Sequence, residues 1–153
     1  MDNLIATTVR KALDELKLNY HEDESVFEFN IRVEHTNAAV KVVCAEDQEI
    51  LIAVAFSGVF APEEKIDAVC RWICNKNIKC NIGNYTIDTE DGEVSFRVSC
   101  PVDGGAVNSE IAKVAILNAI KTIDDDYLEL LKLLYFDNES TEIPGAKTET
   151  ELS

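Results

Sequence analysis

The feature that most constrains the fold of this sequence is an alternating segment between Gly83 and Cys100 with Asp91-Gly92 inside it. An Asp-Gly pair favours a two-residue type I′ turn, because both central positions of that turn need positive φ angles. Counting outward from such a turn predicts a hairpin with one apolar and one polar face. The expected apolar pairs are Thr89 with Val94, Ile87 with Phe96, Tyr85 with Val98 and Gly83 with Cys100. Because a one-residue slip would exchange the two faces, the pattern predicts antiparallel strands in a defined register.

A helix is predicted immediately before this hairpin, beginning near residue 62. Pro62 suits the first helical position, where a missing N–H costs nothing, and the acidic residues that follow it suit the positive end of the helix dipole. Trp72 and Ala68 lie off the core stripe of this helix. A large aromatic residue away from the core is a candidate for a subunit interface, although a neighbouring element of the same chain would also explain it.

Periodicity predicts the other elements. The sequence indicates a helix over residues 3–18, with Asp2 or Asn3 as its N-cap, and strands over 27–34, 38–45 and 49–56. Two further helices are expected, one from Asn108 or Ser109 to Ile123 and one from Asp124 to Phe136. The order α-βββ-α-ββ-αα predicts an α+β fold, an antiparallel sheet of about five strands with helices packed against it. Residues 1–137 would form a single domain, followed by a disordered acidic tail over residues 138–153.

The strand over 49–56 is apolar on both of its faces. One face would pack on the predicted core, so another partner has to shield the second face from water. Another element, a second subunit or a bound peptide would provide this cover. The residues expected to offer an apolar sheet face to a partner are Val43, Leu51, Ala53 and Ala55.

The chain resembles the YbjN family in the order of several short segments. They are the run PEEK, an apolar-periodic helix with Asn75 and Asn77 near its end, the run GNYTID, the Asp-Gly turn and the run EVSFRVS. This resemblance implies a fold like that of type III secretion chaperones, in which the second helix commonly contributes to dimerisation. It also implies a small, acidic, dimeric protein with a role in bacterial sensory transduction or regulation, and it supplies no catalytic residues.

The net charge of the chain disfavours some classes of binding partner. The 153-residue chain has a net charge of −15 and is 46% hydrophobic. Nucleic acid and anionic membrane surfaces would repel most of such a surface, so neither is an expected partner. The N-terminus lacks the pattern of a signal peptide, and we expect a cytoplasmic protein.

Cysteine is the residue type that most needs a chemical interpretation. Cys70 and Cys74 are four residues apart on the predicted helix and Cys80 lies at its end, but the spacing fits neither the usual zinc site nor a disulfide. Structural thiols are the simpler interpretation. His21 and His35 fall in predicted loops, away from any nucleophile motif. We therefore predict no catalytic residues, no metal ligands and no cofactor.

These observations predict a non-enzymatic homodimer that binds a protein or peptide partner. Trp72 and Ala68 would serve the dimer, and the apolar sheet face would serve the partner. The alternative is a thiol-based redox sensor or a small cysteine-dependent enzyme that uses Cys70, Cys74 or Cys80. A structural or regulatory subunit of a larger assembly is a third interpretation.

Overall fold

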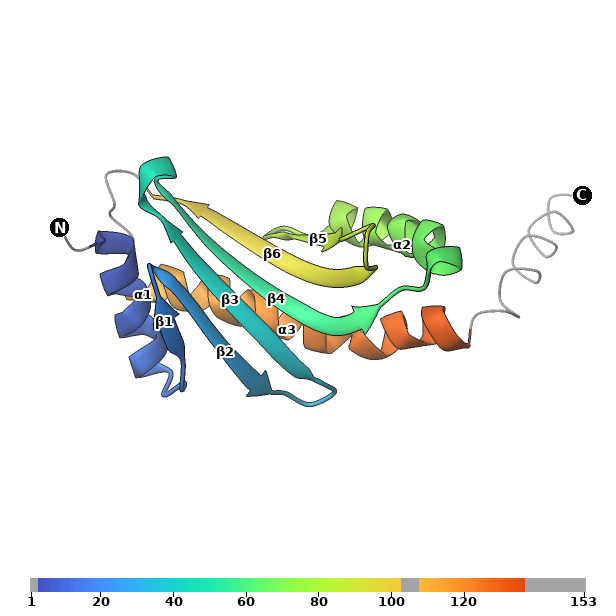
Figure 1. The fold of residues 1–153 in the computed structure, drawn as a ribbon, viewed down its shortest axis with the longest axis horizontal. Helices are drawn as coiled ribbons and strands as arrows, with labels where there is room; N and C mark the ends of the chain where they lie inside the picture. Colours follow the sequence, from blue (N-terminus) through green and yellow to red (C-terminus); the bar gives the residue numbers. More distant parts are fainter. Residues whose placement is uncertain (1–2, 103–107, 137–153) are drawn as a thin grey trace, which may run out of the picture.

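The computed structural model describes residues 3–102 and 108–136, which build a six-stranded antiparallel sheet and three α-helices (Figure 1). The strands lie in the order β1-β2-β3-β4-β6-β5. Their bounds are β1 His21–Asp23, β2 Val26–Arg32, β3 Asn37–Ala45, β4 Ile50–Phe60, β5 Asn84–Ile87 and β6 Glu93–Pro101. The helices are α1 Leu4–Glu15, α2 Ile66–Lys79 and α3 Ser109–Tyr135, with short 3₁₀ turns at Glu46–Gln48 and Glu63–Lys65. The expected disordered tail, residues 138–153, lies outside the described residues.

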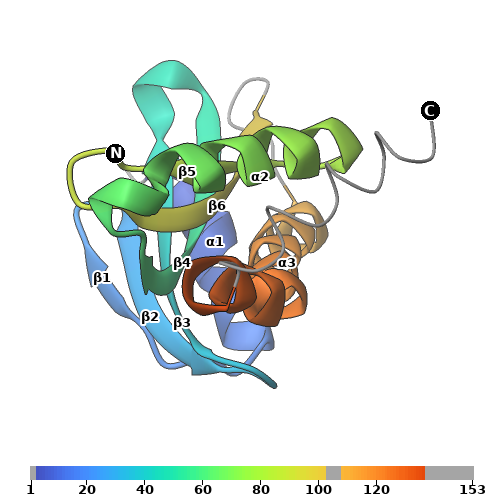
Figure 2. The ribbon, with the colours of Figure 1, turned by 90° about the vertical axis from the view of Figure 1, so that its right-hand side faces the viewer.

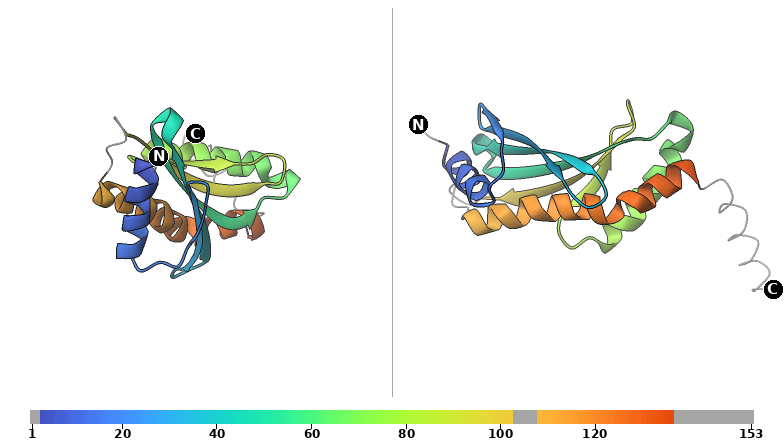
Figure 3. Two further views of the ribbon diagram at one scale, coloured as in Figure 1. Left: turned by 60° about the vertical axis from the view of Figure 1, so that its left-hand side comes forward. Right: turned by 90° about the horizontal axis from the view of Figure 1, so that it is seen from below.

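The α-helices leave one face of the sheet open. α1 and α3 pack on the same face, and α3 runs along almost its whole length (Figures 2 and 3). α2 lies beside β5 at the edge of the sheet (Figure 1). The core therefore lies between the sheet and α1 with α3, and no helix of the described part of the chain covers the opposite face. Among the described residues, none of the helices has the length and apolar character needed to span a membrane.

Side-chain caps fix the starts of the first and last helices. The Asn3 side chain accepts the Ala6 N–H at 3.0 Å, and the Asn108 side chain accepts the Ile111 N–H at 2.8 Å. Each bond satisfies a backbone donor that has no partner within its helix. Both residues were candidate caps from the sequence, and the structure confirms them.

The C-terminal part contains one continuous helix, α3, and the expected break at Asp124 is wrong. Three consecutive aspartates were interpreted as a helix N-terminus, but each has a partner on its flank that holds it inside the helix. These partners are the His35 N–H for Asp124 at 2.7 Å, Lys121 for Asp125 at 2.7 Å, and the Tyr85 hydroxyl for Asp126 at 2.6 Å. The charges are thus compensated by tertiary contacts and by the helix itself.

The strands predicted by alternation are confirmed, with two additions. β1 is a sixth strand, and its three residues are polar and exposed, so alternation of polar and apolar residues does not indicate it. β4 continues to Phe60, four residues beyond the predicted end. Its pairing with β6 is irregular between Phe56 and Phe60, and Gly58 there has a φ of 71°. That positive φ identifies a bulge that glycine adopts without strain.

The β5–β6 hairpin is present, but its predicted register is wrong by two residues. Ile87 pairs with Val94, and Tyr85 pairs with Phe96. The connection is longer than a type I′ turn because the Asp88 carboxylate accepts the Glu90 N–H at 2.9 Å. Of the Asp-Gly pair, only the glycine has a positive φ, at 82°. A shift of two residues preserves the faces, so the apolar side of the hairpin still faces the core.

Gly92 is also where the hairpin loop meets the end of β4. Its carbonyl accepts the Ala61 N–H at 2.8 Å. A Cβ atom at Gly92 would lie 2.1 Å from the Ala61 carbonyl oxygen. The close approach of two backbones therefore requires glycine here, in addition to its positive φ.

α2 begins later than the sequence indicated. Pro62 has extended backbone angles, with φ −65° and ψ 156°, and a 3₁₀ turn precedes the first helical residue, Ile66. At the other end, Asn77 contacts the neighbouring edge strand. Its side-chain oxygen accepts the Tyr85 N–H at 2.6 Å, and its side-chain nitrogen donates to the Tyr85 carbonyl at 3.2 Å. One amide side chain thus occupies both hydrogen-bonding groups that Tyr85 presents at the outer edge of β5.

Candidate binding surfaces

The open face of the sheet carries an apolar patch centred on β4. Strand pairing places Val43 beside Ile52 and beside Val26, so the three share a face. We call this patch the open sheet face, and it consists of the half-buried residues Val26, Val43, Ile50, Ile52, Val54 and Phe56. No helix in the described ranges lies over it. A contiguous apolar patch without a cover is typical of an interaction surface.

The structure corrects three of the four residues predicted for a partner-binding face. Leu51, Ala53 and Ala55 are fully buried against the helices, so they belong to the core. Their alternate neighbours on β4 face outward instead. Val43 lies on the open sheet face and is retained as a candidate.

Charged side chains cross the middle of the open sheet face. Val54 pairs with Lys41 on one side and with Arg97 on the other. Lys41 forms an ion pair with Glu28 at 3.0 Å. The patch is therefore flanked by basic side chains, although the chain as a whole is strongly acidic. The Glu28 carboxylate compensates the charge of Lys41 in part.

Phe56 stands between two hollows on the open sheet face. One, of about 230 Å³, is lined by Asn30, Ala39 and Lys41 among others. The other, of about 350 Å³, is lined by Thr86 and neighbouring residues of the β5–β6 hairpin. Both are shallow and open, as expected of a surface that holds side chains of a peptide better than an enclosed small molecule.

A second surface lies between α2 and the last turns of α3. We call it the α2–α3 groove, and its volume is about 540 Å³. It is lined by Glu64, Asp67, Ala68, Arg71, Trp72, Asn75 and Leu133. Ala68 and Trp72, the two residues predicted for a dimer interface, thus lie on one groove. The structure does not test whether a second subunit occupies it.

Trp72 is only partly covered by its own chain. Its ring packs on Tyr85, with 4.9 Å between centroids, and the Lys76 ammonium lies 5.4 Å from the ring centroid. The indole Nε1 is buried and has no hydrogen-bond partner in the described part of the chain. Part of the ring therefore packs within the chain, as one of the two interpretations predicted, and the residue also lines the groove, while its role in a subunit interface stays a prediction.

A polar network fixes this part of α2 against α3. The Tyr85 hydroxyl donates to the Asp126 carboxylate at 2.6 Å and lies 3.1 Å from the Thr122 carbonyl. Lys76 bonds the other oxygen of Asp126 at 3.0 Å and also pairs with Glu129. Burial, followed by the hydrogen bond to Asp126, raises the pKa of Tyr85 well above its usual value. The hydroxyl therefore stays protonated and acts as a donor.

The cysteines offer no support for thiol chemistry. All five are free. Burial raises the pKa of Cys44 to about 12, and burial also raises the pKa of Cys80 and Cys100. A thiol with a raised pKa is a poor nucleophile at neutral pH. Cys74 is exposed and Cys70 is half-buried on α2.

Comparison with solved structures shows the same fold. The HopA1–SchA chaperone–effector complex matches with a TM-score of 0.56 and 16% identity, over 80% of this chain and 94% of the matched chain. The ExsC–ExsE complex matches with a TM-score of 0.60 and 12% identity, over 82% and 94%. These matches confirm the expected α+β fold of the type III secretion chaperone kind. No curated protein matches the sequence.

Two further comparisons concern the family. The crystal structure of YbjN from E. coli matches with a TM-score of 0.56 and 12% identity, over 88% of this chain and 92% of that one. The family model for YbjN, described as "Putative bacterial sensory transduction regulator", matches residues 6–132. This range includes the whole sheet, α2, most of α1 and α3, and every residue named for either surface except Leu133. The chain therefore belongs to the YbjN family.

Proposed function

We propose that this protein is a non-enzymatic, chaperone-like regulatory module that binds a segment of a partner protein on its open sheet face. The observation that carries the proposal is the apolar patch on β4, which no described helix covers. A sheet face of this kind is stabilised when an apolar partner removes it from water. The hollows on either side of Phe56 would receive alternate side chains of an extended segment.

The comparisons support the class of function without naming the partner. One protein of the same fold is a chaperone in a complex with an effector, and the family carries a regulatory description. Neither is an enzyme by its description. Together they favour protein binding over catalysis for this chain, and they favour it over the thiol-based alternative.

The proposed assembly is a homodimer in which the α2–α3 groove faces its counterpart. Trp72 and Ala68, both half-buried, would lie at this interface. Removing their remaining apolar surface from water would stabilise the dimer. The groove and the open sheet face are separate surfaces, so dimerisation and partner binding would not compete.

Binding on the open sheet face is tested with Val54→Glu. The protein is tagged at its N-terminus in its native host, captured after mild crosslinking, and compared with the variant. The matched control is Val114→Glu, since Val114 is 56% exposed on the outer side of α3, away from both surfaces. We expect a reproducible partner with wild type and the control, and its loss with Val54→Glu. A partner retained by a folded Val54→Glu variant would exclude this face.

The dimer is tested separately by sedimentation of the purified protein. Ala68→Arg should convert a dimer to a monomer, because a long charged side chain would fill the groove. The control is Leu117→Arg, since Leu117 is 43% exposed on α3 outside the groove. A monomeric wild-type protein, or a dimer unchanged by Ala68→Arg, would refute this interface and leave the sheet-face proposal standing.

A further inference from the structure

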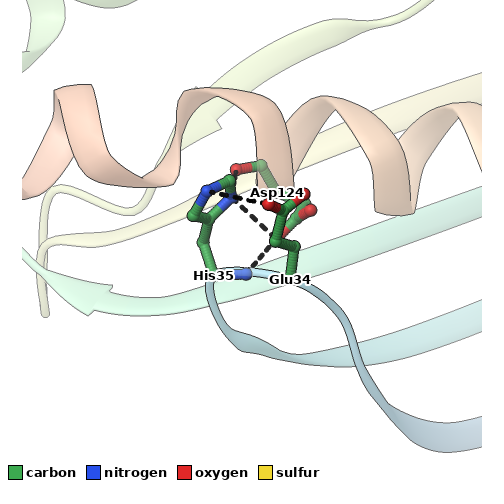
Figure 4. Close-up of side chains that lie close together, drawn as sticks. All are labelled: Glu34, His35 and Asp124. Atoms are coloured by element: carbon green, nitrogen blue, oxygen red, sulfur yellow. Dashed lines mark hydrogen bonds and ion pairs between the residues drawn. The ribbon is translucent and has the colours of Figure 1, made fainter.

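A histidine and two carboxylates from distant parts of the chain meet at one end of the β2–β3 turn. Glu34 and His35 lie in this turn, and Asp124 lies in the middle of α3 (Figure 4). One potential metal-ligand atom of each residue lies within 4.8 Å of the others. The protein-binding function proposed above makes no use of this cluster.

Hydrogen bonds to Asp124 fix the orientation of the histidine. The His35 backbone N–H donates to the Asp124 carboxylate at 2.7 Å. The ring Nδ1 lies 3.1 Å from the Asp124 backbone carbonyl oxygen. A carbonyl oxygen can only accept, so this contact requires the proton on Nδ1, and in the neutral ring the Nε2 lone pair is then available. Histidines that bind metals commonly have this arrangement, with one ring nitrogen donating to a carbonyl and the other bound to the metal.

The free ring nitrogen is directed toward the second carboxylate. Nε2 lies 4.0 Å from Glu34 Oε1. Donor atoms of a tetrahedral zinc site are about 3.3 Å apart for bonds of about 2.0–2.1 Å, so the gap requires only a small adjustment. The Glu34 side chain is 81% exposed and can make it. The Asp124 side chain is 13% exposed, and its Oδ1 lies 3.4 Å from Nδ1, so this carboxylate would turn toward Nε2 when an ion binds there.

The surroundings leave room for further ligands. Glu34 and His35 also line a pocket of about 430 Å³, together with the polar residues Thr36 and Asn37 and with Tyr127. Two basic side chains lie nearby, since Arg32 lines the same pocket and Lys121 is bonded to Asp125 at 2.7 Å. The net charge of −15 raises the local concentration of cations around the whole protein.

We propose that Glu34, His35 and Asp124 bind a divalent transition metal ion of the zinc type. Imidazole nitrogen with carboxylate oxygens is a donor set suited to zinc and its neighbours in the first row, in contrast to calcium, which prefers oxygen alone. Water from the adjoining pocket would complete the coordination. The bound ion would join the β2–β3 turn to the middle of α3, a link independent of dimerisation and partner binding.

The test uses the full chain with Cys70 and Cys74 replaced by serine, because the pair on α2 would otherwise compete for zinc. Zinc is titrated by calorimetry, and cobalt is titrated while the two imidazole rings are followed by NMR. The chain has only two histidines, so His21 serves as an internal control. We expect one equivalent of zinc to bind, and cobalt to broaden the ring signals of His35 and not those of His21. No saturable binding, or equal broadening of both rings, would overturn the proposal.

Point variants distinguish zinc binding at this site from adventitious zinc binding elsewhere on the chain. His35→Gln should weaken zinc binding at least tenfold, while His21→Gln should leave it unchanged. Asp124→Asn should also weaken it, although the asparagine oxygen can still accept the His35 N–H and keep the turn in place. Circular dichroism checks that each variant is folded. Zinc affinity that is unaffected by both His35→Gln and Asp124→Asn would refute the assignment.

Discussion

The Tyr85–Asp126 hydrogen bond leads to a prediction whose magnitude follows from the geometry. Tyr85→Phe removes the hydroxyl and leaves the ring, which packs on both Trp72 and Phe96 with centroid separations of 4.9 Å. The lost bond is 2.6 Å long and its acceptor is a carboxylate. Hydrogen bonds to charged groups contribute about 1.5–3 kcal/mol, so the free energy of unfolding should fall by about 2 kcal/mol. Asp126 keeps its Lys76 partner, which prevents a larger loss.

The assay is urea unfolding followed by fluorescence of Trp72, the single tryptophan of the chain. A double-mutant cycle with Asp126→Ala should give a coupling energy of about 1–2 kcal/mol, because changes in helix propensity cancel in the cycle. The control is Asp125→Asn, which breaks an exposed ion pair with Lys121 and should cost at most about 0.5 kcal/mol. A Tyr85→Phe loss no larger than that of the control, or a coupling energy near zero, would refute the reasoning.

Three further predictions test the assignment of faces, turns and thiols. Leu51→Ala should lower the free energy of unfolding by about 2–5 kcal/mol, and Ile52→Ala by less than half as much, because only Leu51 is in the core. Equal losses for the two variants in urea unfolding would contradict this assignment of faces. Gly58→Ala should lower the free energy of unfolding by about 1–2 kcal/mol through its positive φ alone, and Gly92→Ala should lower it more because the new Cβ would clash with the Ala61 backbone. A smaller loss for Gly92→Ala than for Gly58→Ala would disprove that contact. Cys74 should react with a thiol reagent in the native protein before any other cysteine, as peptide mapping would show; first reaction at another cysteine would contradict its exposed position.

Much of the fold was predictable because alternation and helical periodicity agree with the tertiary structure. The central strands and the caps Asn3 and Asn108 follow from local chemistry that the rest of the chain reinforces. One failure occurs where a distant residue supplies a partner, and another where a local side-chain hydrogen bond changes a turn. Local sequence indicated a helix start at Asp124, but His35 approaches it from the sheet. The Asp88 carboxylate lengthened the hairpin loop by a side-chain bond that the Asp-Gly pair does not indicate.

The assignment of the faces of β4 needed information from its neighbours. β4 is apolar on both sides, so its own sequence does not identify the core face. The adjacent strands carry the missing signal, because Lys41 and Arg97 alternate with buried residues and both pair with Val54. Aligning the three strands by their charged positions would have placed Val54 outward and Leu51 inward. The α2–α3 groove had no comparable signal beyond Trp72, because Leu133 comes from a distant helix.

The cap that Asn77 places on the edge of β5 determines how copies of this protein can associate through their sheets. A chain of subunits joined strand to strand would need a free edge at both ends of every sheet, so that each copy receives one neighbour and offers itself to the next. Because Asn77 occupies the outward N–H and C=O of Tyr85, the β5 end cannot receive a strand there. Pairing through the remaining edge would end after two copies. The side-chain amide of Asn77 thus prevents strand-to-strand pairing at this edge from extending into a filament of subunits.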